Sequence, residues 1–178
     1  MEQFRGTTIL AIKRNGKTVV IGDGQVTVGQ SIMLKGTAHK VRKIYNGKVI
    51  IGFAGGTADA YTMYEEFEKM LNKYSGSLMR SAVELGKDIR KGTYGKGMEA
   101  MMIVADKDNL LILTSMGDVI EPDDGICATG SGGNFALSAA KALLNNTDME
   151  AKEIAFKAME IASDLCIFTN KNYIVEEV

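Results

Sequence analysis

The order of strand-like and helix-like segments constrains this fold more than any other feature of the sequence. Apolar, β-rich runs at 8–14, 17–22 and 48–54 precede two segments with helical spacing, at 57–74 and 78–89. Strand-like runs return at 100–105, 110–114, 118–120 and 126–129, followed by two more helical segments and a closing run at 173–178. Helices in pairs argue against a doubly wound parallel sheet. We therefore expect an α+β fold, a four-layer αββα sandwich of two antiparallel sheets covered by helix pairs.

Short local signals support several of these boundaries. Asn15-Gly16 and Asn46-Gly47 are dipeptides typical of tight turns between strands. One apolar stripe at helical spacing marks the segment 57–74, and it consists of Ala60, Tyr64, Phe67 and Leu71. Thr147 with Glu150 predicts a capping box at the start of the fourth helix.

Composition limits the classes of partner. The 178 residues are 46% hydrophobic and 24% charged, as expected of one ordinary globular domain. A net charge of −1 gives no electrostatic case for nucleic acid or an anionic membrane. Residues 1–6 lack the apolar core of a secretory signal, and no apolar run is long enough to span a membrane. The two cysteines form no CxxC pair and there is a single histidine, so we do not expect a zinc site. We expect a cytoplasmic protein in which both cysteines stay reduced.

Residues 5–8, Arg-Gly-Thr-Thr, lie at the start of the first long strand. A threonine hydroxyl is a poor nucleophile unless a base lies beside it, and the α-amine of an N-terminal threonine can be that base. The chemistry requires a removable leader, a small residue before the scissile bond and a rigid strand after it. Met1–Gly6 and the strand from Thr8 meet these needs. Alternatively, two β-branched residues simply favour the start of a strand.

A carboxylate and a basic run are the next candidates for chemistry. Asp23 lies between two glycines at the end of the second strand, although a plain Asp-Gly turn has the same sequence. In the basic run 39–43, strand alternation would point Lys40 and Arg42 one way and Val41 and Lys43 the other. A lysine that faces inward needs a carboxylate such as Asp23 beside it. The alternative is a solvated basic face.

Two glycine-rich loops run from a strand into a helix, at 52–57 and 130–133. Such loops present backbone N–H groups that suit a phosphate or an oxyanion. Neither loop matches GxGxxG or GxxxxGK[ST], which disfavours a nucleotide-binding module. The glycines could also serve only to let helices pack closely on strands.

Taken together, these segments resemble the HslV (ClpQ) peptidases, bacterial relatives of proteasome β-subunits in the N-terminal-nucleophile hydrolase superfamily. The similarity covers the chain from Gly6 to Val178. Its motifs are Thr7-Thr8-Ile9, Gly22-Asp-Gly-Gln25, Lys40-Val-Arg42, Asn46-Gly-Lys-Val49, Gly52-Phe-Ala-Gly-Gly-Thr-Ala-Asp59, Ala82-Val-Glu-Leu85, Gly130-Ser-Gly-Gly133 and Cys166-Ile-Phe-Thr-Asn170.

The resemblance implies a site and an assembly. Residues 1–6 would be a removable propeptide and 7–178 one peptidase domain. Thr7 would be the nucleophile, with Asp23 and Lys40 beside it, Ser131 near its α-amine and the Gly55 N–H in the oxyanion hole. Main-chain oxygens of Ser163, Cys166 and Thr169 would bind a sodium ion. The chain itself would bind no ATP. Two stacked hexameric rings would associate with the AAA+ unfoldase HslU (ClpY) to degrade unfolded proteins.

Further residues are expected at the surface that meets the ATPase. Lys35, Arg42 and Lys43 are candidates, because C-terminal carboxylates of a partner need cationic groups. The chain departs from the family pattern at Ser163, at Asn134 and in the glycine-containing stretch 88–97, and its leader is longer than usual. None of these departures touches the expected catalytic set. The alternative function is an inactive structural ring subunit of the same fold.

Overall fold

The computed structural model describes residues 4–29, 31–94 and 99–178. Its helices are α1 (Thr57–Lys73), α2 (Leu78–Arg90), α3 (Gly133–Asn146) and α4 (Ala151–Leu165). Its strands are β1 (Phe4–Arg5), β2 (Thr8–Arg14), β3 (Lys17–Gly22), β4 (Val26–Val28), β5 (Ile32–Lys35), β6 (Val41–Ile44), β7 (Val49–Gly55), β8 (Ala100–Ala105), β9 (Leu110–Thr114), β10 (Val119–Ile120), β11 (Ile126–Gly130) and β12 (Ile174–Glu177). Part of the unusual stretch 92–97 lies outside the described residues.

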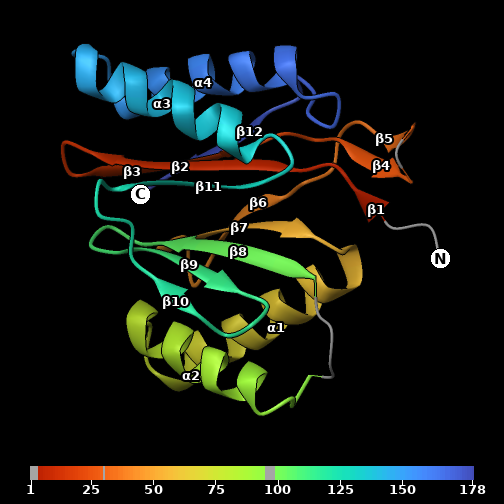
Figure 1. Cartoon of the computed structure of the whole chain (residues 1–178). Helices are drawn as coiled ribbons and strands as arrows, with labels where there is room; N and C mark the ends of the chain where they lie inside the picture. Colours follow the sequence, from red (N-terminus) through yellow and green to blue (C-terminus); the bar gives the residue numbers. More distant parts are fainter. Residues whose placement is uncertain (1–3, 30, 95–98) are drawn as a thin grey trace.

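The elements form the expected four layers (Figure 1). One sheet has the order β11-β2-β3-β12 and is covered by α3 and α4, while the other has the order β10-β9-β8-β7-β6 and is covered by α1 and α2. All of the paired strands within these two sheets are antiparallel. The predicted αββα sandwich is therefore confirmed.

Strand alternation explains why both faces of each sheet are buried. In β2, Leu10 and Ile12 pack under α3 and α4, whereas Ile9 and Ala11 face the other sheet. In β7, Val49, Ile51 and Phe53 pack under α1 and α2, whereas Ile50 faces the other sheet. The central strands thus bury side chains in both directions, which gives near-continuous apolar runs instead of alternation with polar residues.

The turn predictions are confirmed, but the capping box is wrong. Asn15 and Gly16 adopt positive φ between β2 and β3, and Asn46 and Gly47 do so between β6 and β7. Helix α4 begins at Ala151, so Glu150 itself is the N-cap and makes no side-chain cap hydrogen bond. Thr147 instead ends α3, where its hydroxyl donates to the carbonyl of Leu143 at 2.7 Å.

A third, three-stranded sheet was not expected from the sequence. Its order is β1-β4-β5, and β1 is formed by the residues just before the predicted cleavage site. The backbone of Phe4 pairs with Val28 and that of Arg5 with Thr27. All four residues of β5 are exposed, so the strand lacks the apolar-polar alternation by which strands are recognised. Among the described residues, no helix is long and apolar enough to cross a membrane.

Candidate active site

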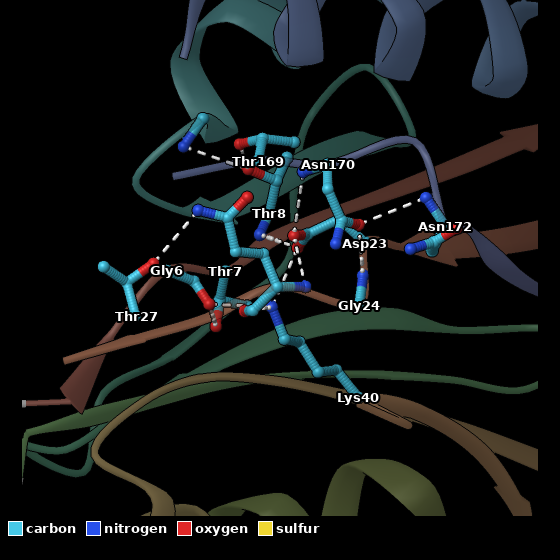
Figure 2. Close-up of polar contacts among 12 residues, drawn as sticks. Gly6, Thr7, Thr8, Asp23, Gly24, Thr27, Lys40, Thr169, Asn170 and Asn172 are labelled. Carbon is cyan, nitrogen blue, oxygen red and sulfur yellow. Dashed lines mark hydrogen bonds and ion pairs between the residues drawn. The ribbon is translucent and has the colours of Figure 1, made fainter. Parts of the chain in front are cut away.

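A fully buried carboxylate, Asp23, lies directly after β3 and is held from several sides (Figure 2). Its Oδ1 accepts a hydrogen bond from the backbone N–H of Thr8 at 2.7 Å. Its Oδ2 accepts from the N–H of Gln25 at 2.9 Å and from that of Asn170 at 3.3 Å. These hydrogen bonds hold the Asp23 carboxylate in a fixed position, and the residue is not the exposed aspartate of a plain turn.

Lys40 supplies the matching charge. Its Nζ lies 2.9 Å from Asp23 Oδ1, and its side chain is 5% exposed. The same Nζ donates to the Gly6 carbonyl at 2.7 Å and to the carbonyl of Gln25. Burial lowers the pKa of the Lys40 ammonium, and the charge of Asp23 and the hydrogen bond to it oppose this shift. The three donor positions of the ammonium are matched by three acceptors, one of which is the Asp23 carboxylate.

Thr7 and the peptide bond before it lie against Lys40. The Thr7 hydroxyl donates to the Gly6 carbonyl at 2.6 Å, so the oxygens of the expected nucleophile and of the preceding peptide bond are adjacent. Gly6 has a φ of 110°, and a Cβ added there would lie 2.8 Å from Thr27 Oγ1. Only glycine fits this backbone without strain. The small residue that the sequence placed before the cleavage site is therefore required by the local geometry.

A hydroxyl pair beside Thr7 was not identified as part of the site from the sequence. Thr8 Oγ1 lies 2.6 Å from Thr169 Oγ1 and accepts a hydrogen bond from the Gly132 N–H at 3.0 Å. Both threonines are buried. These contacts tie the start of β2 to the loop before α3 and to the loop after α4. Thr169 was considered only for its main-chain oxygen, and the one available signal for its side chain was its place in the Cys-Ile-Phe-Thr-Asn motif.

Ser131 and Gly55 lie on the two glycine-rich loops. Ser131 is exposed directly before Gly132, in the turn between β11 and α3. In the part of the chain that is described, it forms no hydrogen bond with Thr7, which still carries Gly6 on its nitrogen. Gly55 is the last residue of β7, with a φ of 116°, and an added Cβ would collide with the Glu99 carbonyl. This loop therefore also requires glycine, irrespective of any oxyanion role.

The basic run does not point as strand alternation suggested. Lys40 precedes β6 and is buried. Arg42 does not point the same way: its Cζ lies 5.8 Å from the ring centroid of Tyr61 and 5.7 Å from that of Tyr64. Lys43 is exposed and lies 3.8 Å from Glu176 of β12. The reason is that β6 begins at Val41, so strand alternation does not include Lys40. Arg42 and Lys43 consequently lie on opposite faces of β6.

Lys35 remains as an exposed cation at the end of β5. It has no ion-pair partner among residues 4–29, 31–94 and 99–178. Because Arg42 and Lys43 are neighbours in β6 and lie on opposite faces of it, the three residues considered for partner binding do not share one face.

The three residues considered for sodium lie around the C-terminal end of α4. Ser163 is in the last turn, Cys166 is the C-cap and Thr169 follows three residues later, with its N–H donating to the Cys166 carbonyl at 3.0 Å. Carbonyls at a helix C-terminus lack their usual N–H partners and lie at the negative end of the helix dipole. The described residues contain no group of three or more His, Cys, Asp or Glu that could hold a metal. Any cation here would therefore be bound mainly by main-chain oxygens.

An αββα sandwich of two antiparallel sheets covered by helix pairs is the fold of the N-terminal-nucleophile hydrolases. A model of the proteasome subunit family matches residues 3–178. The chain is 54% identical over 178 residues to the ATP-dependent protease subunit HslV of Sulfurihydrogenibium sp., covering 100% of this chain and 99% of that protein. It is also 54% identical to the HslV subunit of Enterococcus faecalis, covering 99% and 98%. The chain belongs to the proteasome family.

Solved structures agree with this assignment. The crystal structure of HslV from Trypanosoma brucei matches with a TM-score of 0.90 and 42% identity, over 96% of this chain and 98% of that one. A Thiobacillus denitrificans protein described as BPH, solved with epoxomicin, matches with a TM-score of 0.70 at 16% identity, over 96% and 97%. The latter shows only a common fold. The resemblance to HslV seen in the sequence motifs is confirmed.

Proposed function

We propose that this chain is the peptidase subunit of an ATP-dependent protein-degradation complex, with Thr7 as an N-terminal nucleophile. The observation that carries the proposal is the contact set around Lys40. One buried ammonium lies 2.9 Å from the Asp23 carboxylate and 2.7 Å from the carbonyl just before Thr7. Burying a charged pair costs desolvation free energy whatever its role, and the attraction and hydrogen bonds of the pair often do no more than offset that cost, so stability alone is a weak reason to keep it. An inactive ring subunit would have no need for it at this position.

The first reaction removes residues 1–6. Thr7 Oγ attacks the Gly6 carbonyl carbon, the C–N bond breaks as the Thr7 nitrogen takes a proton, and the leader is transferred to the hydroxyl as an ester. Lys40 polarises the Gly6 carbonyl oxygen, to which it already donates a hydrogen bond. Water then hydrolyses the ester and leaves a free α-amine on Thr7. The hydrogen bond from Thr7 Oγ1 to the Gly6 carbonyl supports this proposal, since it places the hydroxyl at the scissile bond.

The second reaction is peptide hydrolysis. The freed α-amine, with an unperturbed pKa near ~8, accepts the hydroxyl proton as Oγ attacks a substrate carbonyl. The charge of Lys40 lowers the pKa of that amine and keeps part of it neutral at pH 7. The Gly55 N–H would stabilise the oxyanion, a type of contact worth roughly 3 kcal/mol elsewhere. Ser131 would orient the amine once Gly6 has gone. Transfer of the proton to the leaving nitrogen gives an acyl ester on Thr7, which water hydrolyses.

The names of the HslV relatives support an assembly with an ATPase. We propose a cytoplasmic homo-oligomer of two stacked hexameric rings, which receives unfolded proteins from an AAA+ unfoldase of the HslU type and itself binds no ATP. A net charge of −1 supports neither nucleic acid nor an anionic membrane as a partner.

We also propose a sodium ion bound by the main-chain oxygens of Ser163, Cys166 and Thr169. A bound cation would neutralise the negative end of α4 and stiffen the loop that carries Thr169. Thermal unfolding measured in sodium chloride and in choline chloride at equal ionic strength tests this. The midpoint should be higher in sodium, and equal midpoints would rule the site out.

Intact-mass measurement of the purified protein tests the nucleophile. We expect the mature chain to begin at Thr7, and we expect that fraction alone to hydrolyse a fluorogenic peptide. A preparation that keeps residues 1–6 in full and still cleaves the peptide would exclude an N-terminal amine as the base.

A second experiment tests the partner. Adding a cognate AAA+ ring with ATP should raise peptide hydrolysis several-fold and should be required for degradation of a stably folded protein. Lys35→Glu should weaken the stimulation, because carboxylates of the partner would meet a negative charge. Lys17→Glu is the matched control, since Lys17 is an exposed lysine at the start of β3. Equal stimulation of both variants would exclude Lys35 from the interface.

A further inference from the structure

The side chain of Asn170 contacts the loop that carries Asp23, as Figure 2 shows, and also the loop that leads to Lys40. We propose that Asn170 is a positioning residue, whose side-chain amide keeps Asp23 and Lys40 in register for catalysis at Thr7. This inference rests on the proposed threonine-peptidase function. Asn170 is half-buried in the loop after α4 and was considered in the sequence only as part of the motif 166–170.

On one side, Asn170 contacts the Asp23 loop through two bonds. Its backbone N–H donates to Asp23 Oδ2 at 3.3 Å, and its side-chain Oδ1 accepts from the Gly24 N–H at 3.1 Å. The second bond fixes the residue directly after the carboxylate. Gly24 has no room to move toward the neighbouring loop, since an added Cβ would lie 3.0 Å from the Thr37 Cα.

On the other side, Asn170 Nδ2 donates to the Gly36 carbonyl at 2.8 Å. Gly36 directly follows the exposed strand β5 and lies four residues before Lys40. Among the described residues, the same two segments are also joined by the hydrogen bond from the Ala38 N–H to the Gly24 carbonyl at 2.9 Å, by the pairing of Val26 with Lys35 where β4 meets β5, and by Lys40 Nζ itself. One amide group therefore uses its oxygen for the Asp23 loop and its nitrogen for the Lys40 loop.

The arrangement matters because Asp23 and Lys40 come from different sheets. Asp23 follows β3 of the four-stranded sheet, and Lys40 precedes β6 of the five-stranded sheet. A displacement of about 1 Å in a catalytic group can cost roughly 10²-fold in rate. Asn170 adds to the Lys40–Asp23 ion pair and to the β4–β5 pairing a link from the residue beside the carboxylate to the segment before the lysine, where the exposed β5 strand supplies no buried packing.

Asn172 provides a matched control. Its Nδ2 also donates to the Gly36 carbonyl at 2.8 Å, but its side chain makes no contact with Gly24 or Asp23 in the described part of the chain. Only its backbone N–H reaches Asn170 Oδ1, at 3.1 Å, and alanine would keep that bond. Replacing Asn172 removes one donor from Gly36 and leaves the link between the two loops intact.

The test compares kcat and KM for peptide hydrolysis, together with the rate of leader removal, in three variants. Asn170→Ala should lower kcat by roughly 10- to 100-fold, with KM within about twofold, and should slow the loss of residues 1–6. Asn170→Asp keeps the acceptor for Gly24 but loses the donor to Gly36, so its loss in kcat should be intermediate. Asn172→Ala should match wild type in kcat and in the rate at which residues 1–6 are removed.

The outcomes separate this inference from the function on which it rests. If wild type hydrolyses peptide and Asn170→Ala has the same kcat, or changes only KM, the positioning role is refuted. If Asn170→Ala and Asn172→Ala lose activity equally, the link between the loops is not the cause and the proposal also fails. If wild type neither loses its leader nor hydrolyses peptide, the threonine-peptidase proposal itself fails. Should Asn170→Ala not fold, Asn170→Asp carries the same test, because it preserves the volume and the Gly24 bond.

Discussion

Thr7→Ala should abolish peptide hydrolysis and leave residues before position 7 attached. Alanine has no hydroxyl to attack the Gly6 carbonyl, so the leader stays and no α-amine is released at this position. Loss of the nucleophile of a serine protease lowers kcat by about 10⁶-fold, and a loss of at least ~10³-fold is expected here. Intact mass and a fluorogenic peptide assay measure the two effects in one preparation. The fold should be retained, since Thr7 contributes only a hydrogen bond to its neighbour.

Thr7→Ser is the matched control for this variant. Serine keeps a hydroxyl at the same position, so the leader should still be removed and part of the activity should remain. Normal removal of the leader from Thr7→Ala would show that another protease does the processing. If Thr7→Ala hydrolysed the peptide at the wild-type rate, Thr7 would be excluded as the nucleophile.

The layers of the fold could be predicted because each central strand is a near-continuous run of apolar residues. The runs at 8–14 and 49–55 are buried on both faces, and each helix on the outer face of a sheet buries one apolar stripe. The small sheet could not be predicted in this way. Strand β5 is exposed along its whole length, and β1 has only two residues, so neither shows an alternation.

The site was predictable only in part. A buried lysine needs a carboxylate, and that requirement alone linked Lys40 to Asp23. The contacts of Thr8 with Thr169 and of Asp23 with Asn170 could not be derived in the same way, because they join residues 161 and 147 positions apart. Local sequence carries no signal for such pairs. The capping box failed for a different reason, since a four-residue motif also occurs where one helix ends before the next begins.

Lys40→Met should lower peptide hydrolysis by at least ~10²-fold and move the remaining activity to higher pH. Methionine has a similar length but no charge, so the Thr7 α-amine would lose its cationic neighbour. The pKa of that amine would then rise toward its ordinary value near ~8, and less of it would be neutral at pH 7. The rate as a function of pH between about 6 and 9 measures both effects. Lys48→Ala, which removes an exposed lysine in the turn before β7, should leave the profile unchanged.

Loss of stability must be separated from loss of catalysis in this variant. Lys40→Met leaves the Asp23 carboxylate buried with no counter-charge, which costs about 3–5 kcal/mol in comparable pairs. The double variant Asp23→Asn with Lys40→Met removes both charges, so its thermal stability should recover toward that of wild type. Its activity should not recover, because the cation beside Thr7 is still absent. A double variant that regained both stability and peptide hydrolysis would show that the buried pair serves the fold alone.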